Sequence, residues 1–488
     1  MVKGDMEKGS DLNVFLNPKS VAVIGASQKP KSWGSAIMED LLSRPYPGKV
    51  YPVNVNGKSV YGLPAFKDVR EINGPVDLAI FIIPEQAVEE MITACSQKQV
   101  KGIIIVTSGF GEISETGIVR EKSLVKLAHS YGIRLLGPNV SGVYNLHADF
   151  VAARTRTKQI RRTALAAISQ GGFAFHDLLA SGSHRNTGVG KFVHTGNECD
   201  LTVTDFLEHF GQDPEVKGIV LYIETIRDGR RFIKVARQVT KEKLVVAYKA
   251  GRTPGGARAA QSHTAALAGT TEIYKALLHQ VGIIVSPTME LLLPLGHALL
   301  ERPPMRGSKV AIVTMGGSWG VALTDFVEEN GLLVPELSLN LQKRLTSLGM
   351  PRRASIRNPI DIGAIGQFPP VDTVVSIGRE VLSSGEVDAI ILHGVGLPGI
   401  VKEDVLFTNQ PFLELEKQMI LGFNSLETEI KRPVLIGNHS SPWESQAIFD
   451  MNQLGIRIYQ RIDEIAQLLS LMYKYWKDWG RKGLPPST

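Results

Sequence analysis

The stretch SVAVIGASQKPKSWGSAIMEDLL, residues 20–42, contains the unit from which we expect the fold to be built. Its residues 21–25 are apolar or small and include two valines, which predicts a short strand covered on both faces. The strand ends at Gly25, and the residues from Gln28 onward lead into a predicted helix. Such a turn exposes backbone N–H groups at a helix N-terminus, where phosphate binds well. The spacing is not GxGxxG, so support for a dinucleotide site is weak.

Strand-like runs of the same kind recur in the first third of the chain, with amphipathic stretches such as residues 85–99 between them. Because strands alternate with helices, this part of the chain predicts a doubly wound α/β domain with a parallel sheet. The further strands are expected at residues 50–54, 77–84, 102–108 and 133–139.

Two segments interrupt this alternation of strands and helices. Residues 148–163 are polar, basic and poor in strand signal, and residues 301–309 are rich in proline and glycine. We therefore predict an α/β protein with three doubly wound parallel-sheet domains, at residues 10–150, 160–300 and 305–475. The later strands are expected at residues 164–169, 190–196, 218–224, 244–249, 282–287, 310–317, 388–395 and 433–438, and a last helix is expected from residue 463.

The composition narrows the class of protein. The chain has 488 residues and a formal charge of +6, a basic excess that suits phosphate-bearing ligands as well as nucleic acid. Its two cysteines, Cys95 and Cys199, argue against a disulfide framework and a cysteine-rich metal site, and they fit a reducing cytosol. No signal-like core is present, and no apolar run reaches the roughly 18–20 residues of a membrane helix. We expect a cytoplasmic protein that binds neither nucleic acid nor membrane and holds no metal.

Several expected strands end in residues that could hold a ligand. IIPEQ and VTSGFGE, at residues 82–86 and 106–112, lie at such ends in the first domain. In the second domain SQGG, residues 169–172, separates a strand from a probable helix, and GGSWG at residues 316–320 does so in the third. Ligands of such sheets bind beyond the carboxyl ends of the strands, which favours a nucleotide-like ligand. For each single turn, tight turn chemistry alone is the alternative.

One histidine stands out in KAGRTPGGARAAQSHTAALAG, residues 249–269. The stretch is made mostly of glycine and small residues, which favours a flexible loop around His263. As a metal ligand His263 lacks spaced carboxylate or cysteine partners. A role as a general base is a second possibility. A role as a nucleophile is a third, because imidazole forms covalent intermediates. A structural role is the other possibility for one histidine among 11.

Taken together, the motifs resemble those of the α subunit of ADP-forming (NDP-forming) acyl-CoA synthetases, the acetyl-CoA synthetase group of the succinyl-CoA synthetase superfamily. The run around His263 is the most specific of them, and the matches are ordered along nearly the whole chain. They are SVAVIGAS, GKVYPVN, VDLAIFIIP, GIIIVTSGFGE, GPN, SQGG, LYIE, KAGRT, SHT, VAIVT and NPIDI. The resemblance implies a Rossmann-like CoA-binding domain followed by two flavodoxin-like domains.

The resemblance also implies a reaction, which interconverts acyl-CoA, ADP and phosphate with carboxylic acid, CoA and ATP through acyl phosphate and phosphohistidine. His263 matches the phosphorylated histidine, and Glu224 matches the acid that orients it. The residues that match the phosphate and acyl site are Asn139, Ser169, Gln170, Gly171 and Gly172. Those that fall where the family binds CoA are Gly25, Ala26, Ser27, Lys58, Pro84, Ser108 and Gly109.

The chain departs from the family's usual motifs at several positions. Gly171 stands where a serine is usual, Ala265 stands where a glycine is usual, and Phe173 and Trp319 are bulky additions. These changes fit a reshaped acyl pocket. They also fit a CoA-ester lyase or transferase, or a non-catalytic CoA-binding subunit of the same fold, so these alternatives stay open.

The family also needs an ATP-grasp module, which binds ATP or ADP with Mg²⁺. We find no room for it before residue 488, so the resemblance predicts an ATP-grasp β subunit as partner, in an α2β2 heterotetramer. The remaining partners would be CoA and a small carboxylic acid.

Overall fold

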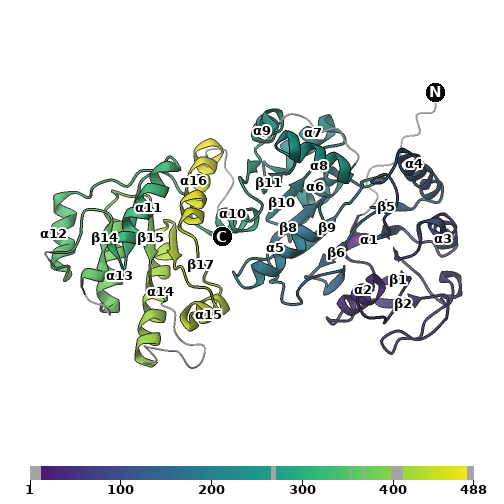
Figure 1. The fold of residues 1–488 in the computed structure, drawn as a ribbon, viewed down its shortest axis with the longest axis horizontal. Coiled ribbons are helices and arrows are strands. Elements are labelled where there is room, and N and C mark those ends of the chain that lie inside the picture. Colours follow the sequence, from purple (N-terminus) through teal and green to yellow (C-terminus); the bar gives the residue numbers. More distant parts are fainter. Residues whose placement is uncertain (1–11, 265–270, 352, 366–368, 397–409, 481–488) are drawn as a thin grey trace. The chain divides into compact units, whose positions relative to one another are not determined.

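The computed structural model describes residues 12–264, 271–351, 353–365, 369–396 and 410–480 (Figure 1). Within them the chain forms three sheets. Each sheet contains five parallel strands in one spatial order, in which the first strand along the chain lies between the second and the third. This is a doubly wound order, and its switch point lies between the first and third strands. The predicted α/β class is therefore confirmed.

The first sheet is entirely parallel and has the order β2-β1-β3-β4-β5. Its strands lie where the sequence predicts them, and the three central strands are runs buried on both faces. They are β1 (Ser20–Ile24), β2 (Lys49–Val53), β3 (Leu78–Phe81), β4 (Gly102–Ile105) and β5 (Arg134–Leu136). The helices of this part are α1 (Asn13–Leu16), α2 (Trp33–Leu41), α3 (Val88–Ser96) and α4 (Glu115–Ser130), with the short 3₁₀ turns η1 (Val69–Glu71) and η2 (Glu85–Ala87).

The second sheet has seven strands in the order β12-β11-β10-β8-β9-β6-β7. Five of them form the parallel part, and β6 and β7 extend it as an antiparallel edge. The strands are β6 (Gly142–Asn145), β7 (Phe150–Ala153), β8 (Leu165–Ser169), β9 (Lys191–His194), β10 (Gly218–Ile223), β11 (Leu244–Lys249) and β12 (Ile284–Val285). The helices are α5 (Phe173–Ser183), α6 (Val203–Gln212), α7 (Gly229–Val239), α8 (Pro254–Thr264), α9 (Thr271–Gln280) and α10 (Leu292–Glu301).

The expectation that residues 148–163 contain no strand is wrong for their first part. Residues 150–153, FVAA, are buried and pair with β6, and the charged residues begin only at Arg154. Four apolar residues inside a basic stretch are too few to give a periodic signal. The limits 10–150, 160–300 and 305–475 remain predictions.

The third sheet is parallel and has the order β14-β13-β15-β16-β17. Its strands are β13 (Val310–Thr314), β14 (Ile360–Asp361), β15 (Ala389–His393), β16 (Val434–Gly437) and β17 (Ile458–Tyr459). The helices are α11 (Gly317–Glu329), α12 (Leu339–Ser347), α13 (Val371–Ser383), α14 (Gln410–Ile430), α15 (Gln446–Gln453) and α16 (Ile462–Asp478), with η3 at Ile362–Ala364. The two-residue strands β14 and β17 were too short to be predicted from the sequence.

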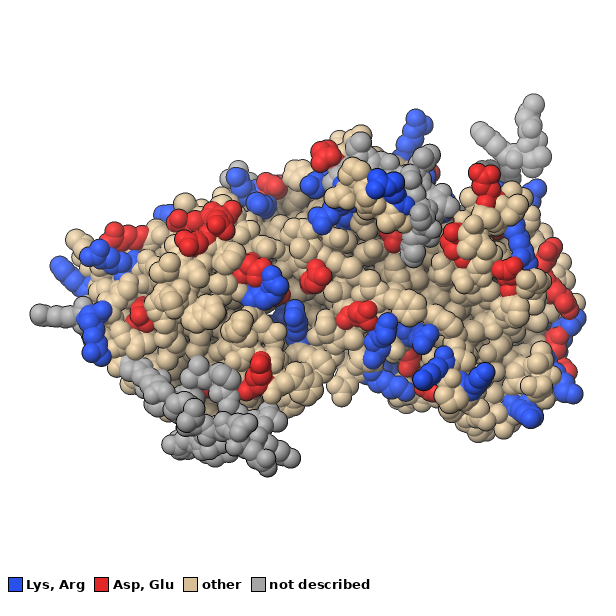
Figure 2. Space-filling model, viewed as in Figure 1, with Lys and Arg blue, Asp and Glu red and all other residues tan. Residues whose placement is uncertain are grey.

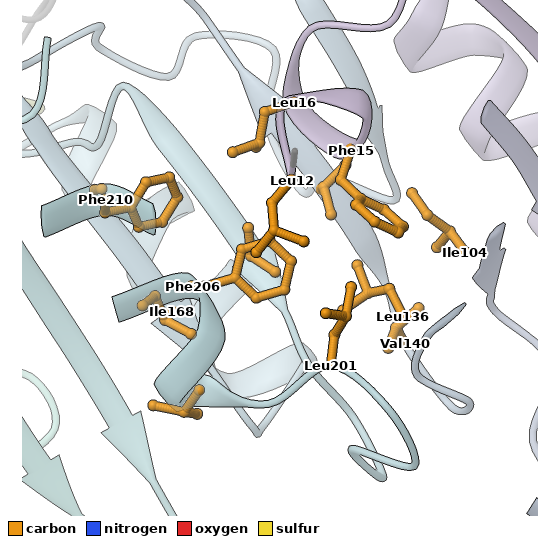
Figure 3. Packing of buried hydrophobic residues seen from close by; sticks show 14 of the residues in the cluster. Leu12, Phe15, Leu16, Ile104, Leu136, Val140, Ile168, Leu201, Phe206 and Phe210 are labelled. Atoms are coloured by element: carbon orange, nitrogen blue, oxygen red, sulfur yellow. The ribbon is translucent and has the colours of Figure 1, made fainter. Parts of the chain in front are cut away.

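One apolar core joins the first sheet to the second. Phe15 of α1 meets Phe206 of α6 edge to face, with ring centroids 6.3 Å apart. Leu136 and Val140 pack into the same cluster from the end of β5, and Ile168 does so from β8 (Figure 3). The chain accordingly divides into two compact units, residues 1–180 with 188–292, and residues 181–187 with 293–488. The second unit has a core of its own, around Leu341, Ile377 and Phe423 among others.

Two further features are the length and apolar character of the helices and the distribution of charged side chains on the surface. Among the described helices, none has both the length and the apolar character that crossing a bilayer requires. Lys and Arg side chains are interspersed with Asp and Glu on the face drawn in Figure 2.

Candidate functional site

A cavity of about 1100 Å³ lies in the first unit, where strands of the first and second sheets end. Its walls come from the ends of β3 and β4 in the first sheet and from the switch point of the second sheet, at the ends of β8 and β10. Open α/β sheets bind ligands at this position, because the loops on either side of the switch diverge. The walls consist of residues 82–86, 106–108, 139–141, 170–174, 196–197 and 250–251 together with Trp33, His194, Tyr222, Glu224, Gly256 and Ala259.

The cavity brings together about half of the residues expected from the sequence. Those that line it are Pro84, Ser108, Asn139, Gln170, Gly171, Gly172 and Glu224. Those that do not line it are Gly25, Ala26, Ser27, Lys58, Gly109 and Ser169. The side chain of His263 and the whole of Ala265 lie outside the described residues. The role of each remains a prediction.

The turn from β8 to α5 is closed on both sides by aromatic rings. A side chain at Gly171 would place its Cβ 2.8 Å from Cε1 of Tyr222, and one at Gly172 would place it 2.6 Å from Cε1 of His194. Ser169 is buried, and its hydroxyl donates to the carbonyl of Gly171 at 2.5 Å. In the described part of the chain, no acceptor takes the backbone N–H groups of Gly171, Gly172 or Phe173. The turn therefore presents free donors to the cavity at the N-terminus of a helix, which suits an anion.

Gln170 ties this turn to the end of β10. Its Oε1 accepts hydrogen bonds from the backbone N–H groups of Glu224 and Thr225 at 2.5 and 2.9 Å, and its Nε2 donates to the carbonyl of Thr225 at 3.0 Å. The side chain of Gln170 also bonds the carboxyl of Glu198, which accepts the N–H of Val203 at 2.9 Å. Burial raises the pKa of Glu198 to about 7. A buried carboxyl with a raised pKa thus lies beside the Gln170 side chain that ties this turn to β10.

His194 holds the other side of the turn in one tautomer. Its Nδ1 accepts the backbone N–H of Ser141 at 2.7 Å, so the proton resides on Nε2, which donates to the carbonyl of Gln170 at 3.0 Å. The Ser141 hydroxyl lies 2.9 Å from this Nδ1 and 2.8 Å from Nε2 of His176. Burial lowers the pKa of His176 to about 4, so the His176 imidazole is neutral at pH 7. This buried network fixes the backbone of Gln170 and Gly171.

Glu224 lies at the end of β10 and is 6% exposed. Tyr222, two residues earlier, lines the cavity and bonds the Glu224 carboxyl through its hydroxyl, an interaction that raises the pKa of Tyr222 together with burial. On the neighbouring strand, Lys249 is paired in register with Ile223. Glu224 thus lies beside a phenol, and the buried ammonium of Lys249 is close enough to interact with it electrostatically without forming an ion pair. This setting suits a carboxylate that orients an imidazole.

The expectation of a loop around His263 is wrong for residues 254–264, which form the helix α8. The local sequence explains the helix. Thr253 precedes it and accepts the N–H of Gly256 through its hydroxyl at 3.0 Å, Pro254 occupies its first position, and alanines follow. Gly256 and Ala259 of α8 line the cavity, and His263 lies about one helical turn after Ala259.

The turn after β1 differs from the turn after β8. The backbone N–H groups of Gly25 and Ala26 both donate to the carbonyl of Val53, at 2.9 and 3.1 Å. The Ser27 hydroxyl accepts the N–H of Lys29 at 2.9 Å, and Lys58 is exposed. After β4, the N–H of Gly109 donates to Glu112 at 2.5 Å. Three of the expected CoA-binding N–H groups are therefore already bonded within the protein.

Several side chains of the site escaped the sequence analysis. His194, Tyr222 and Lys249 each lie at or next to the end of a strand. A polar residue at the end of an apolar strand is the signal that could have identified them. Trp33 lines the cavity and lies 5.8 Å from the ring of Phe173, whose side chain is half exposed. Trp319, in the second unit, contacts His393. Among the described residues, no three His, Cys, Asp or Glu side chains converge in a way that could hold a metal ion.

Comparisons with known proteins identify the family of the first unit's two parts. Residues 19–145 match the family described as a CoA binding domain, and residues 162–299 match the succinyl-CoA ligase like flavodoxin domain. The chain is 42% identical, over 72% of its length and 76% of the relative's, to the α subunit of acetate–CoA ligase (ADP-forming) II of Pyrococcus furiosus. It is 35% identical to the α subunit of enzyme I of the same organism, over 96% of this chain and 99% of that one.

A solved structure shows the same fold. It is the dinucleotide-forming acetyl-coenzyme A synthetase 1 of Ca. Korarchaeum cryptofilum in complex with phosphate and ADP, which matches with a TM-score of 0.81 and 32% identity. The match covers 96% of this chain and 98% of that one. With the two P. furiosus subunits, it shows that this chain belongs to the family of ADP-forming acetate–CoA ligase α subunits.

Proposed function

We propose that this chain is the α subunit of an ADP-forming acyl-CoA ligase. The enzyme would interconvert acyl-CoA, ADP and phosphate with a carboxylic acid, CoA and ATP. The observation that carries the proposal is the pairing, at one switch point, of an open helix N-terminus at Gly171–Phe173 with the buried acid Glu224. The first of these suits an anionic phosphate, and the second suits an imidazole that receives it.

CoA fits the part of the cavity that the first sheet forms. Pro84 and the exposed Ser108 line it at the ends of β3 and β4, where ligands of doubly wound sheets bind. These residues, with Asn139 across the cavity, would hold the pantetheine arm and lead it toward Gly171. When bound, CoA supplies the thiol that forms or leaves the thioester.

The first chemical step would take place at the β8–α5 turn. A phosphate oxygen attacks the acyl carbon, the carbon–sulfur bond breaks, and the sulfur takes up a proton as the thiol leaves. The product is an acyl phosphate. The N–H groups of Gly171, Gly172 and Phe173 would bind the phosphate oxygens, and they need no reorganisation because Tyr222 and His194 already fix the turn.

The second step would transfer the phosphoryl group to His263. A ring nitrogen attacks phosphorus, the bond from phosphorus to the acyl oxygen breaks, and the carboxylate leaves. Glu224 would accept the N–H of the other ring nitrogen and so leave the attacking one unprotonated. Phosphohistidine then gives its phosphoryl group to the β-phosphate oxygen of ADP, and the nitrogen–phosphorus bond breaks.

The nucleotide would bind to an ATP-grasp β subunit together with Mg²⁺, and we propose an α2β2 assembly in the cytoplasm. The names of the P. furiosus relatives support a partner, since both are subunits. The buried free thiol of Cys95 and the half-buried one of Cys199 support a reducing compartment.

The test combines this chain with an ATP-grasp β chain, ATP, Mg²⁺, CoA and a panel of acids. We expect acyl-CoA, and we expect an alkali-stable phosphoryl group on His263 by mass spectrometry. His263→Ala should abolish both, and Glu224→Gln should slow labelling by about a hundredfold or more. His209→Ala, at a half-buried position of α6 outside the cavity, is the matched control and should label like wild type. Equal labelling of the His263→Ala variant would refute the mechanism. CoA-ester turnover by the chain without nucleotide would indicate a lyase or transferase instead.

A further inference from the structure

Lys249 is a buried cation beside the site. It is the last residue of β11, and only 2% of it is exposed. Its Nζ donates to the carbonyl of Ala250 and lies 4.6 Å above the ring of Tyr274 on α9. Ala250 and Gly251, which directly follow it, line the cavity. Lys249 therefore contacts the chain just before α8 and again just after the segment that carries His263.

In the described structure Lys249 has no carboxylate within ion-pair distance. Lys191, a second buried lysine of the same sheet, shows the usual arrangement, since it pairs with Asp213 at 2.5 Å and with Glu215 at 2.7 Å. A buried ammonium that lacks such a partner is costly to keep in a fold. A carbonyl and an aromatic face replace only part of its hydration. The fold therefore keeps a positive charge that is not fully compensated.

The proposed reaction supplies the missing negative charge. No lysine or arginine is among the described residues that line the cavity. Glu224 is already present at the end of the neighbouring strand, and a phosphoryl group would add about two further charges. Two anions at one site repel each other unless a cation is near, and the low dielectric of a buried site strengthens both effects.

We propose that Lys249 is a positioning residue for phosphoryl transfer. Its charge balances Glu224 and the phosphoryl group, and its contacts with Ala250 and Tyr274 fix both ends of the histidine-bearing segment. This rests on the proposed function. No bond to Lys249 forms or breaks, so the residue acts through charge and through the position of the chain.

A pH readout separates this role from a purely structural one. Burial lowers the pKa of Lys249, and the Glu224 carboxylate opposes the shift. The titratable groups that face Lys249 are Glu224 from β10 and Tyr274 from α9. Because a lysine loses its charge as the pH rises through its pKa, the wild-type rate should fall at alkaline pH. Lys249→Arg stays charged there, so its rate should fall less.

The experiment compares Lys249→Met and Lys249→Arg with Lys243→Met in the full chain. Lys243 is a matched control because it precedes the same strand at its other end, and its Nζ likewise donates to backbone carbonyls, those of Phe210 and Asp213. With acetyl phosphate as phosphoryl donor, Lys249→Met should form phosphohistidine about a hundredfold more slowly than wild type. Lys249→Arg should restore the rate to within about tenfold, and Lys243→Met to within about twofold.

Affinity for inorganic phosphate, measured by calorimetry, is the readout that does not depend on turnover. Lys249→Met should bind phosphate at least about fivefold more weakly, without loss of thermal stability. If phosphate binding depends on Lys249 but no variant, wild type included, forms phosphohistidine, the inference stands and the proposed function fails. If Lys249→Met labels and binds phosphate like wild type, or if its defects follow a lowered melting temperature, the inference is overturned.

Discussion

Two glycine turns of the first unit have similar sequences and different structures. Both follow the first strand of a doubly wound sheet, and both lead toward a helix. After β1, the N–H groups of Gly25 and Ala26 donate to Val53, and Ser32 caps α2 by accepting the N–H of Ser35 at 3.1 Å. After β8, the N–H groups at Gly171 and Gly172 have no acceptor among the described residues, and both glycines line the cavity.

The difference lies in what occupies the donors. In the β1–α2 turn the protein itself satisfies its backbone groups, as the interior of a fold requires. In the β8–α5 turn these groups have no acceptor among the described residues, and rings and side chains hold the turn open. A glycine after a strand therefore predicts a tight turn, and only the hydrogen-bond inventory separates a structural turn from a binding one. The comparison predicts a loss of activity at one turn and a loss of stability at the other.

The largest effect is expected from Gly172→Ala. Its Cβ would lie 2.6 Å from the His194 ring, so the turn must move and its donors with it. Displacement of about 1 Å at a reacting site costs on the order of a hundredfold in rate. Acyl-CoA formation by the complex should fall by at least this factor, while CoA affinity measured by calorimetry stays near that of wild type.

Gly229→Ala is the matched control, because a Cβ there meets nothing within 4 Å on helix α7. It should retain full activity. A Gly172→Ala variant with activity within about threefold of wild type would show that the β8–α5 turn is not the reacting site.

Gly25→Ala should instead act on stability. Gly25 has a φ of +97°, and its Cβ would lie 2.0 Å from the carbonyl oxygen of Ile82. We expect the free energy of unfolding to fall by about 2–4 kcal/mol, measured by urea denaturation, with activity per folded molecule largely kept. Gly132→Ala measures the cost of a positive φ alone, because Gly132 has a φ of +71° and a Cβ there would meet nothing within 4 Å. It should cost about 1 kcal/mol. Equal losses in the two variants would exclude the clash with Ile82 as a cause.

Some elements of the fold could be predicted from the sequence, and others could not. Apolar runs such as residues 20–24 and 218–223 are strands in any doubly wound sheet, so they were predicted correctly. The strand at residues 150–153 is too short to give a periodic signal and forms by pairing with β6, which lies just before it in the chain. The helix at 254–264 depends on a cap at Thr253. The site was predicted only in outline, because Tyr222, His194 and Lys249 gain their roles from strands that meet in space.

The smallest effect concerns the buried carboxyl that supports only one of the two turns. The β1–α2 turn rests on the carbonyl of Val53, whereas the β8–α5 turn rests on Gln170, which bonds Glu198. Because burial raises the pKa of Glu198 from 4.5 to about 7, the folded state holds a proton there that the unfolded state has released. This contribution to stability is therefore complete below about pH 4.5 and is lost as the pH rises through about 7. Glu198→Gln, which cannot ionise, should be less dependent on pH than wild type by about 1–3 kcal/mol between about pH 5 and about pH 8. Urea denaturation at the two pH values measures this difference.

Glu115→Gln, at an exposed position of α4, is the control and should keep the wild-type dependence of stability on pH. If Glu198→Gln keeps it too, the support of the β8–α5 turn does not titrate in this range, and the two turns differ only in their free donors.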